Sequence, residues 1–253
     1  MEQAVSFLNN QVAWVTGAGS GIGKAIAYKL ASQGAKIAVI DINPDAAVST
    51  AIELEGIHVE CNVADQSSVA AASNYLSEKL GTVDILINAA GITHYEAIAH
   101  HNEDDWQKIL NVNLTGPFHM ARVVHSTMIE KGYGRIVNIA SGSAIRVGAG
   151  VGAYGSSKAG LIALTKALAN EGAPFGVTAN AVAPGLVDTA MMRAHMPETA
   201  MLEQAAQKSD IANPMGLLLK PEEIAHAVAF LCHPDSYSIT GQVIHVNAGA
   251  IMP

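Results

Sequence analysis

The chain has 253 residues, half of them hydrophobic and only 14% charged, so it is long enough to bury the core of one large globular domain. Acidic residues exceed basic ones by eight (22 minus 14), and the basic residues are scattered, which argues against a nucleic-acid partner. No run reaches the roughly 18 apolar residues that span a bilayer, and the first residues do not resemble a secretion signal, so we expect a cytoplasmic protein with no membrane partner.

Short apolar runs alternate with longer amphipathic runs along the whole chain, without a linker or a repeat. This alternation is typical of a parallel sheet with helices on both faces. We therefore predict one α/β domain over residues 1–253 with seven strands in one sheet. The predicted strands are Val12 to Thr16, Lys36 to Ile40, His58 to Cys61, Ile85 to Asn88, Arg135 to Ala140, Thr178 to Val182 and Val243 to Val246.

A glycine-rich turn follows the first predicted strand. It reads Thr16-Gly17-Ala18-Gly19-Ser20-Gly21-Ile22-Gly23 and leads into a helical run over residues 24–33. Glycines permit a tight turn and let a pyrophosphate approach the backbone, while the first N–H groups of the helix receive its negative charge. A glycine cluster is often a plain loop, but the order of strand, turn and helix here indicates a nucleotide site.

Asp41 ends the second predicted strand, 18 residues after Gly23 (41 minus 23). A carboxylate there can accept hydrogen bonds from the adenosine ribose hydroxyls and would repel a 2′-phosphate, so we predict NAD in preference to NADP. The alternative is that Asp41 caps the next helix. Asn43 and Pro44 already suit the cap and the first helical position, which would leave Asp41 free for the ribose.

Two further segments carry polar residues at unusual places. Asn88-Ala89-Ala90-Gly91 ends the fourth strand with small residues against which a flat ring or a ribose could lie. Residues 106–131 then read as one long helix, although Asn113 and Pro117 are unfavourable inside a helix. Either this helix is bent for packing, or Asn113 is held for a purpose.

Tyr154 and Lys158 are expected one turn apart on the same face of a helix, and Ser141 follows the fifth predicted strand. Ligands in open α/β sheets collect at the carboxyl ends of strands, where the Ser141 hydroxyl would emerge. A nearby ammonium lowers the pKa of a phenol, which would suit Tyr154 to acid/base chemistry. Such a pair taken alone is more often two residues covering an apolar surface.

Taken together, these motifs resemble the short-chain dehydrogenase/reductase family over essentially the whole chain. The resemblance implies a Rossmann-type, doubly wound sheet, a homotetramer or else a homodimer, and one domain for both nucleotide and chemistry. It also implies a role for each catalytic residue. Tyr154 is the acid/base, Lys158 lowers the Tyr154 pKa and holds the nicotinamide ribose, Ser141 binds the substrate oxygen, and Asn113 positions a water that relays the proton.

The resemblance likewise implies where the cofactor lies, and Asn62 departs from it by standing where the family commonly has an aspartate facing adenine. An amide oxygen can accept the same bond, so we expect altered adenine contacts. No metal site is expected, because Cys61 and Cys232 have no second ligand at metal spacing. The expected cofactor residues are Gly17, Ser20, Gly21, Ile22, Gly23, Asp41, Asn62, Val63, Asn88, Gly91, Tyr154, Lys158, Pro184, Gly185, Val187 and Thr189.

Residues 186–215 are expected to form a substrate lid. The methionines in this segment suit an apolar substrate or simple packing on the core equally well. By position Arg146 could bind a carboxylate, sulfonate or phosphate, or it could be a surface or subunit-contact residue. The candidate substrate residues are His94, Ser143, Arg146, Met191, Met192 and His195.

The sequence thus predicts an NAD-dependent oxidoreductase that moves a hydride between nicotinamide and a small-molecule secondary alcohol/ketone pair. One alternative is a reductase of 3-oxoacyl groups on acyl carrier protein. Such enzymes usually favour NADP and carry a basic residue in the glycine turn, where this chain has Ser20. The other alternative is a nucleotide-sensing binding module. Those typically lose the tyrosine or the lysine, and this chain keeps both Tyr154 and Lys158.

Overall fold

The computed structural model describes residues 6–209 and 211–252. Its seven strands are parallel and form one sheet in the order β3-β2-β1-β4-β5-β6-β7. The predicted single-domain, doubly wound α/β fold is confirmed, and each strand lies within two residues of its predicted bounds. The strands are β1 Val12–Thr16, β2 Lys36–Asp41, β3 Ile57–Glu60, β4 Ile85–Asn88, β5 Gly134–Ile139, β6 Val177–Pro184 and β7 Val243–Val246.

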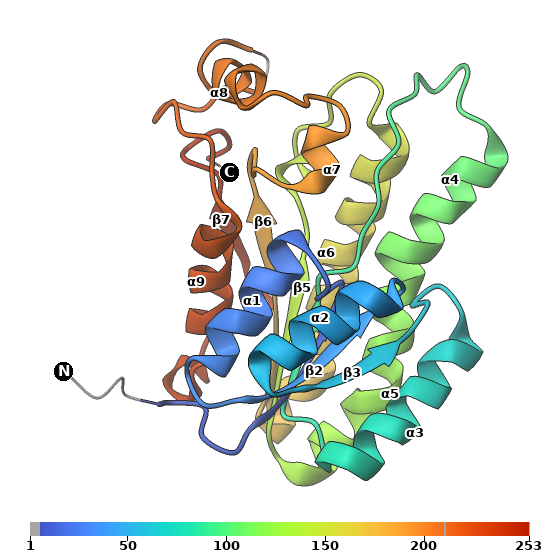
Figure 1. The fold of residues 1–253 in the computed structure, drawn as a ribbon, viewed down its shortest axis with the longest axis vertical. Helices are drawn as coiled ribbons and strands as arrows, with labels where there is room; N and C mark the ends of the chain where they lie inside the picture. Colours follow the sequence, from blue (N-terminus) through green and yellow to red (C-terminus); the bar gives the residue numbers. More distant parts are fainter. Residues whose placement is uncertain (1–5, 210, 253) are drawn as a thin grey trace.

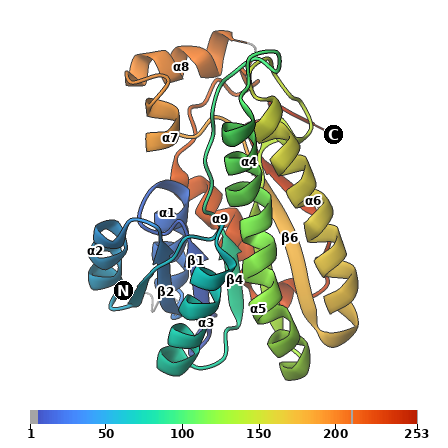
Figure 2. The same cartoon turned by 90° about the vertical axis from the view of Figure 1, so that its right-hand side faces the viewer.

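Helices cover both faces of the sheet because successive strand side chains point to opposite sides. Along β1, Ala13 and Val15 belong to the core beneath α1, α2 and α9, whereas Val12 and Trp14 belong to the core beneath α3, α5 and α6. Figures 1 and 2 show the resulting three layers. The helices are α1 Gly21–Ala31, α2 Pro44–Leu54, α3 Gln66–Leu80, α4 Glu103–Leu110, α5 Gly116–Lys131, α6 Gly152–Gly172, α7 Ala190–Arg193, α8 Thr199–Lys208 and α9 Pro221–Cys232.

The strand order reverses between β1 and β4, since β1 pairs with β2 on one side and with β4 on the other. Thr16 joins the two strand ends there: its Oγ1 accepts hydrogen bonds from the N–H groups of Ala89 at 3.0 Å and Ala90 at 3.1 Å. The chain leaves β1 and β4 toward opposite faces of the sheet, so a crevice opens between them. This crevice is where the binding site lies.

The predicted long helix over residues 106–131 is wrong in one respect. The chain is helical from Glu103, but a π-helical turn, Asn111–Thr115, separates α4 from α5. Pro117 cannot donate the usual bond and its ring would clash with the preceding turn, and the wider π turn accommodates it. The predicted cap of α2 is confirmed: the Asn43 side chain accepts a hydrogen bond from the N–H of Ala46.

α7 and α8 lie beyond the carboxyl ends of the strands, at the top of Figure 1. A small cluster of Leu186, Leu202 and Ala206 supports them, with Met192 and Met196 packed against it. Within the described ranges, no helix has the length and apolarity needed to cross a membrane. Cys61 and Cys232 are both buried free thiols.

Candidate active site

A large pocket of about 480 Å³ opens at the carboxyl ends of the central strands, beside the point where the strand order reverses. It is lined by every predicted cofactor residue except Asn88, and by Ser141. Asn88 lies beneath it, fully enclosed, and its Nδ2 donates a 2.8 Å hydrogen bond to Oδ1 of Asn138. Residues from the whole length of the chain therefore meet around one cavity.

The turn between β1 and α1 can accept a dinucleotide pyrophosphate. Gly17 has φ +65°, and a Cβ there would lie 2.8 Å from Cα of Ala90, so only glycine lets the turn cross so close to the end of β4. Above Gly21 the space is open, because a Cβ there would meet nothing nearer than Cγ2 of Thr189 at 3.6 Å. The side chain of the capping residue Ser20 makes no bond to the first amide groups of α1. These amides can receive a phosphate.

Asp41 lines the pocket but is not free, which corrects the sequence prediction. Its Oδ2 accepts a hydrogen bond from the N–H of Gly19, and its Oδ1 accepts one from the N–H of Asn43, both at 2.9 Å. The carboxylate thus braces the glycine turn against the end of β2. Each oxygen keeps one acceptor position, so the carboxylate can still bind ribose hydroxyls.

The Asn62 side chain is also engaged within the protein. Its Oδ1 accepts a 3.1 Å hydrogen bond from the N–H of Ala64, two residues along the chain. The acceptor that we expected to face adenine therefore first supports a local turn.

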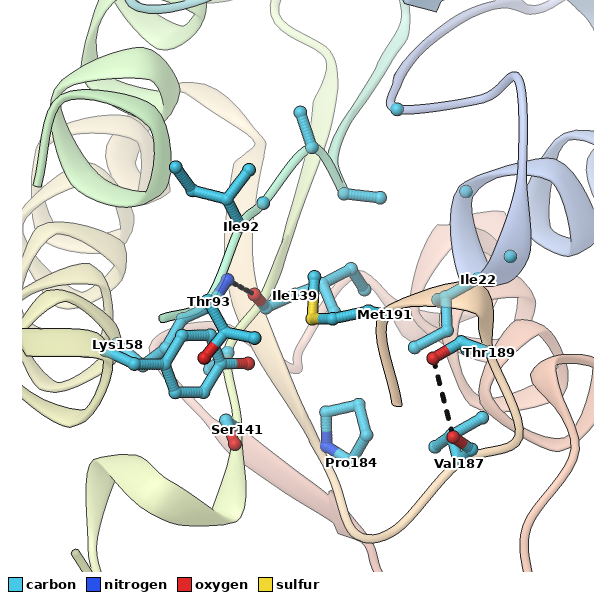
Figure 3. A pocket seen from close by; sticks show the side chains of 18 of the residues that line it. Ile22, Ile92, Thr93, Ile139, Ser141, Lys158, Pro184, Val187, Thr189 and Met191 are labelled. Carbon is cyan, nitrogen blue, oxygen red and sulfur yellow. Dashed lines mark hydrogen bonds between the residues drawn. The ribbon is translucent and has the colours of Figure 1, made fainter. Parts of the chain in front are cut away.

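Tyr154, Lys158 and Ser141 line the same pocket. Figure 3 shows Lys158 and Ser141 at one side of it. The Ser141 hydroxyl lies near enough to the Tyr154 phenol to lower its pKa. Ser141 Oγ also accepts a 3.1 Å bond from the N–H of Ser143, which fixes its direction. Nζ of Lys158 donates to the carbonyl oxygen of Ile139 at 2.7 Å and stands 5.7 Å from the centre of the Tyr154 ring.

Burial, not the neighbouring ammonium, dominates the acidity of this pair. Burial raises the pKa of Tyr154 to about 12, although the nearby Ser141 hydroxyl partly opposes this shift. Burial also lowers the pKa of Lys158 to about 8. That Lys158 lowers the Tyr154 pKa stays a prediction. The ammonium donates its hydrogen bond to the Ile139 carbonyl, and burial is the largest cause of the Tyr154 shift.

Asn113 is buried in the π turn behind the pocket, and both ends of its amide make hydrogen bonds. Its Oδ1 accepts from the N–H of Ile92, and its Nδ2 donates to the Ile92 carbonyl, both at 2.9 Å. Nδ2 also donates to Ser157 Oγ at 3.1 Å, and that hydroxyl donates to the Tyr154 carbonyl. Asn113 is thus held for a purpose: it fastens the loop after β4 to α6.

The predicted substrate residues divide into two groups. Ser143, Arg146, Met191 and Met192 line the pocket. His94 lines neither this pocket nor the hollow beside it, and its ring lies 3.8 Å from the Asp105 carboxylate and packs against His101.

His195 lines the smaller adjoining hollow, and its ring contacts Tyr95. Tyr95 lines the main pocket, and no motif in the sequence predicted this. The nearest signal was its position one residue after His94. Within the described residues, no cluster of three or more His, Cys, Asp or Glu side chains is arranged to hold a metal ion.

Replacing Lys158 with methionine should make the stability of the protein depend differently on pH. Between about pH 8 and 10.5 the unfolded chain holds a proton on Lys158 that the folded chain has lost, so the wild-type protein gains stability as pH rises. Lys158→Met removes this dependence. The free energy of unfolding of the variant minus that of the wild type should therefore fall by up to about 3 kcal/mol from pH 8 to pH 10.5, measured by urea unfolding.

Lys166→Met is the matched control, because Lys166 lies on the same helix and is exposed. Its difference from the wild type should stay constant with pH. If the difference in free energy of unfolding between Lys158→Met and the wild type also stays constant with pH, the pKa of the buried ammonium is not lowered.

A family model and two relatives that match this chain carry the names of reductases and dehydrogenases. Residues 17–250 match the family model described as enoyl-(acyl carrier protein) reductase. The chain is 40% identical over 249 residues to a 3-oxoacyl-(acyl-carrier-protein) reductase of Vibrio cholerae, covering 97% of this chain and 99% of that one. It is 38% identical over 247 residues to a hydroxy(phenyl)methylsuccinyl-CoA dehydrogenase subunit of Thauera aromatica, covering 96% and 97%. A solved structure described as a gluconate dehydrogenase from Agrobacterium tumefaciens superposes with a TM-score of 0.91 at 32% identity, covering 98% of each chain.

Proposed function

The chain belongs to the short-chain dehydrogenase/reductase family, and we propose that it is an NAD-dependent enzyme for a secondary alcohol and its ketone. It is an oxidoreductase of CH–OH and ketone groups with a nicotinamide cofactor and a small-molecule substrate. The observation that carries the proposal is that Ser141, Tyr154 and Lys158 line one pocket together with the glycine turn. A substrate oxygen placed between the Ser141 and Tyr154 hydroxyls would meet two donors at once.

Tyr154 is proposed as the acid/base and Ser141 as the donor that orients the substrate oxygen. With a pKa of about 12, the phenol keeps its proton at neutral pH and can give it to the oxygen of a ketone as that oxygen becomes an alkoxide. The nicotinamide, when bound, supplies or accepts the hydride. In the oxidative direction the phenol must first release its proton.

Lys158 and Asn113 are proposed to support that exchange. Lys158, with a pKa of about 8, is mostly charged at neutral pH, so it can stabilise a phenolate and donate to a ribose hydroxyl. Asn113 holds the loop whose Gly91 lies beside Lys158: a Cβ on Gly91 would stand 3.4 Å from Asn113 Oδ1 and 3.5 Å from Lys158 Nζ. The expected water relay would run through the space between Gly91, Asn113 and Lys158.

NAD is proposed over NADP because Asp41 brings a carboxylate to the rim of the pocket at the end of β2. A 2′-phosphate placed there would face like charge without a compensating cation in the glycine turn, where Ser20 stands. Two further features follow from the family alone: residues 186–215 act as a lid, and the protein is a homo-oligomer, a tetramer or else a dimer.

A second candidate is the reduction of a 3-oxoacyl group on a carrier thiol. The observation that favours it is the activity for which the relatives are named: one is a 3-oxoacyl-(acyl-carrier-protein) reductase and another a dehydrogenase of a CoA thioester. The methionines and Ile251 in the pocket would suit an acyl chain. Asp41 argues against the NADP preference that usually accompanies this activity.

The test is direct. The protein is incubated with NAD or NADP and a panel of secondary alcohols and 3-hydroxyacyl thioesters, and the reduced cofactor is followed by absorbance. We expect turnover with NAD and at least one secondary alcohol. Turnover confined to 3-hydroxyacyl thioesters with NADP would favour the second candidate. Binding of the nucleotide with no turnover of either panel would favour a nucleotide-sensing module.

A further inference from the structure

Two aromatic rings meet where the pocket and the adjoining hollow lie side by side: Tyr95 lines the pocket and His195 lines the hollow. Tyr95 comes from the segment between β4 and α4, which rises beside α7 in Figures 1 and 2. His195 follows α7. The ring centres lie 4.4 Å apart with an interplanar angle of 61°, an edge-to-face contact. This contact joins the loop that carries Gly91 to the segment that covers the site.

Tyr95 is part of the wall around the reacting groups. It lines the same pocket as Ser141 and Tyr154, and a negative charge on its phenol would raise the pKa of Tyr154. Burial raises the pKa of Tyr95, although 44% of the residue's surface is exposed. The ring therefore stands at the rim, with one side toward the cavity and the other toward solvent.

Behind this contact lies a hollow of about 270 Å³ that shares Gly91, Ile92, Thr93 and Met191 with the main pocket. His195 closes its other side. Thr93 Oγ1 is buried and has no hydrogen-bond partner among the described residues. Figure 3 places Thr93 on the same side of the pocket as Lys158 and Ser141. An unsatisfied buried hydroxyl suits a polar atom of a bound ligand.

We propose that Tyr95 and His195 form an aromatic clasp that bounds the substrate space, and that Tyr95 thereby limits the size of the group accepted beside the reacting carbon. His195 is a positioning residue, because it acts on the substrate through the Tyr95 ring. The inference rests on the proposed function for its substrate, but the clasp itself is a property of the protein without one.

The first test measures substrate preference. Tyr95→Ala removes the ring, and we expect the ratio of kcat/KM for a bulky over a small secondary alcohol to rise about tenfold or more. His195→Ala should move the ratio in the same direction by less. Tyr95→Phe and His195→Phe keep a ring in place and should keep the ratio within about twofold of the wild type. An equal change for bulky and small alcohols in Tyr95→Ala would overturn the specificity role.

His233→Ala is the matched control. The ring of His233 makes an edge contact of the same kind with Phe7, at 4.3 Å and 62°, and neither residue lines the pocket or the hollow. This variant should leave the substrate ratio unchanged.

The second test needs no turnover. Hydrogen exchange is measured at the amides of Arg193 and Ala194, which donate to the carbonyls of Thr189 and Ala190. His195→Ala and Tyr95→Ala should lose protection there, and His233→Ala should not. If protection at these two amides is unchanged in His195→Ala and Tyr95→Ala, the contact between the two rings does not hold α7 in place and the proposed clasp is wrong. If the wild type oxidises no alcohol, the proposed function fails, and the exchange result still decides whether the clasp exists.

Discussion

Tyr154→Phe should lower kcat by about a thousandfold while NAD binding stays nearly intact. The substitution removes only the hydroxyl, and the ring keeps its place over Lys158, whose Nζ stands 5.7 Å from the ring centre. The lost group is the one that exchanges a proton with the substrate oxygen in the proposed reaction. Ser141 would keep its hydrogen bond from the N–H of Ser143 but would have no phenol proton source beside it.

The measurement combines steady-state turnover with a direct titration of NAD. Tyr133→Phe is the matched control: it also removes a partly buried phenol hydroxyl, one that bonds to the Gln11 side chain outside the pocket. Its turnover should equal that of the wild type. Unchanged turnover in Tyr154→Phe would remove Tyr154 from the mechanism.

Asp41→Ala should lower the ratio of kcat/KM with NAD to kcat/KM with NADP by about tenfold or more. The substitution removes the charge that would repel a 2′-phosphate, and it removes an acceptor for the ribose hydroxyls. It also removes the two 2.9 Å hydrogen bonds that hold the N–H groups of Gly19 and Asn43. Part of the loss with NAD will therefore come from a looser glycine turn.

Asp41→Asn separates these effects, because an amide oxygen retains one acceptor while the charge is gone. The ratio of kcat/KM for NAD over NADP is measured for both variants. Asp65→Asn is the control: Asp65 also accepts a backbone N–H bond, from Ser67, but it does not line the pocket. An unaltered ratio in both Asp41 variants would refute the ribose assignment.

The fold could be predicted from the sequence because the hydrophobic patterns that indicate strands and helices extend over only a few residues. Residues such as Val12, Ala13, Trp14 and Val15 are apolar on both sides of the strand, which predicts a strand buried on both faces, and the structure divides them between two cores. The π turn at Asn111–Thr115 was not readable, although Asn113 and Pro117 marked the place. A disfavoured residue shows that a helix is disturbed, but neighbouring packing decides how.

The candidate site was readable where spacing along one element sets it. Tyr154 and Lys158 share a helix face because the residues lie one turn apart, and α6 carries both. The partners of Asp41 were not readable, since Gly19 lies on another loop and only the assembled turn brings its N–H to the carboxylate.

The sequence by itself determined the order of strands and helices along the chain, the glycine turn and the residue types around the pocket. It could do so because hydrophobic periodicity and residue spacing act over a few residues. Only the tertiary structure decided the acidity of Tyr154 and Lys158, which depends on how much surrounding protein excludes water from both. It also decided that Tyr95 faces the pocket while His94 points toward Asp105. Adjacent side chains in a loop point in different directions, and contacts with distant segments such as the one carrying His195 select between them.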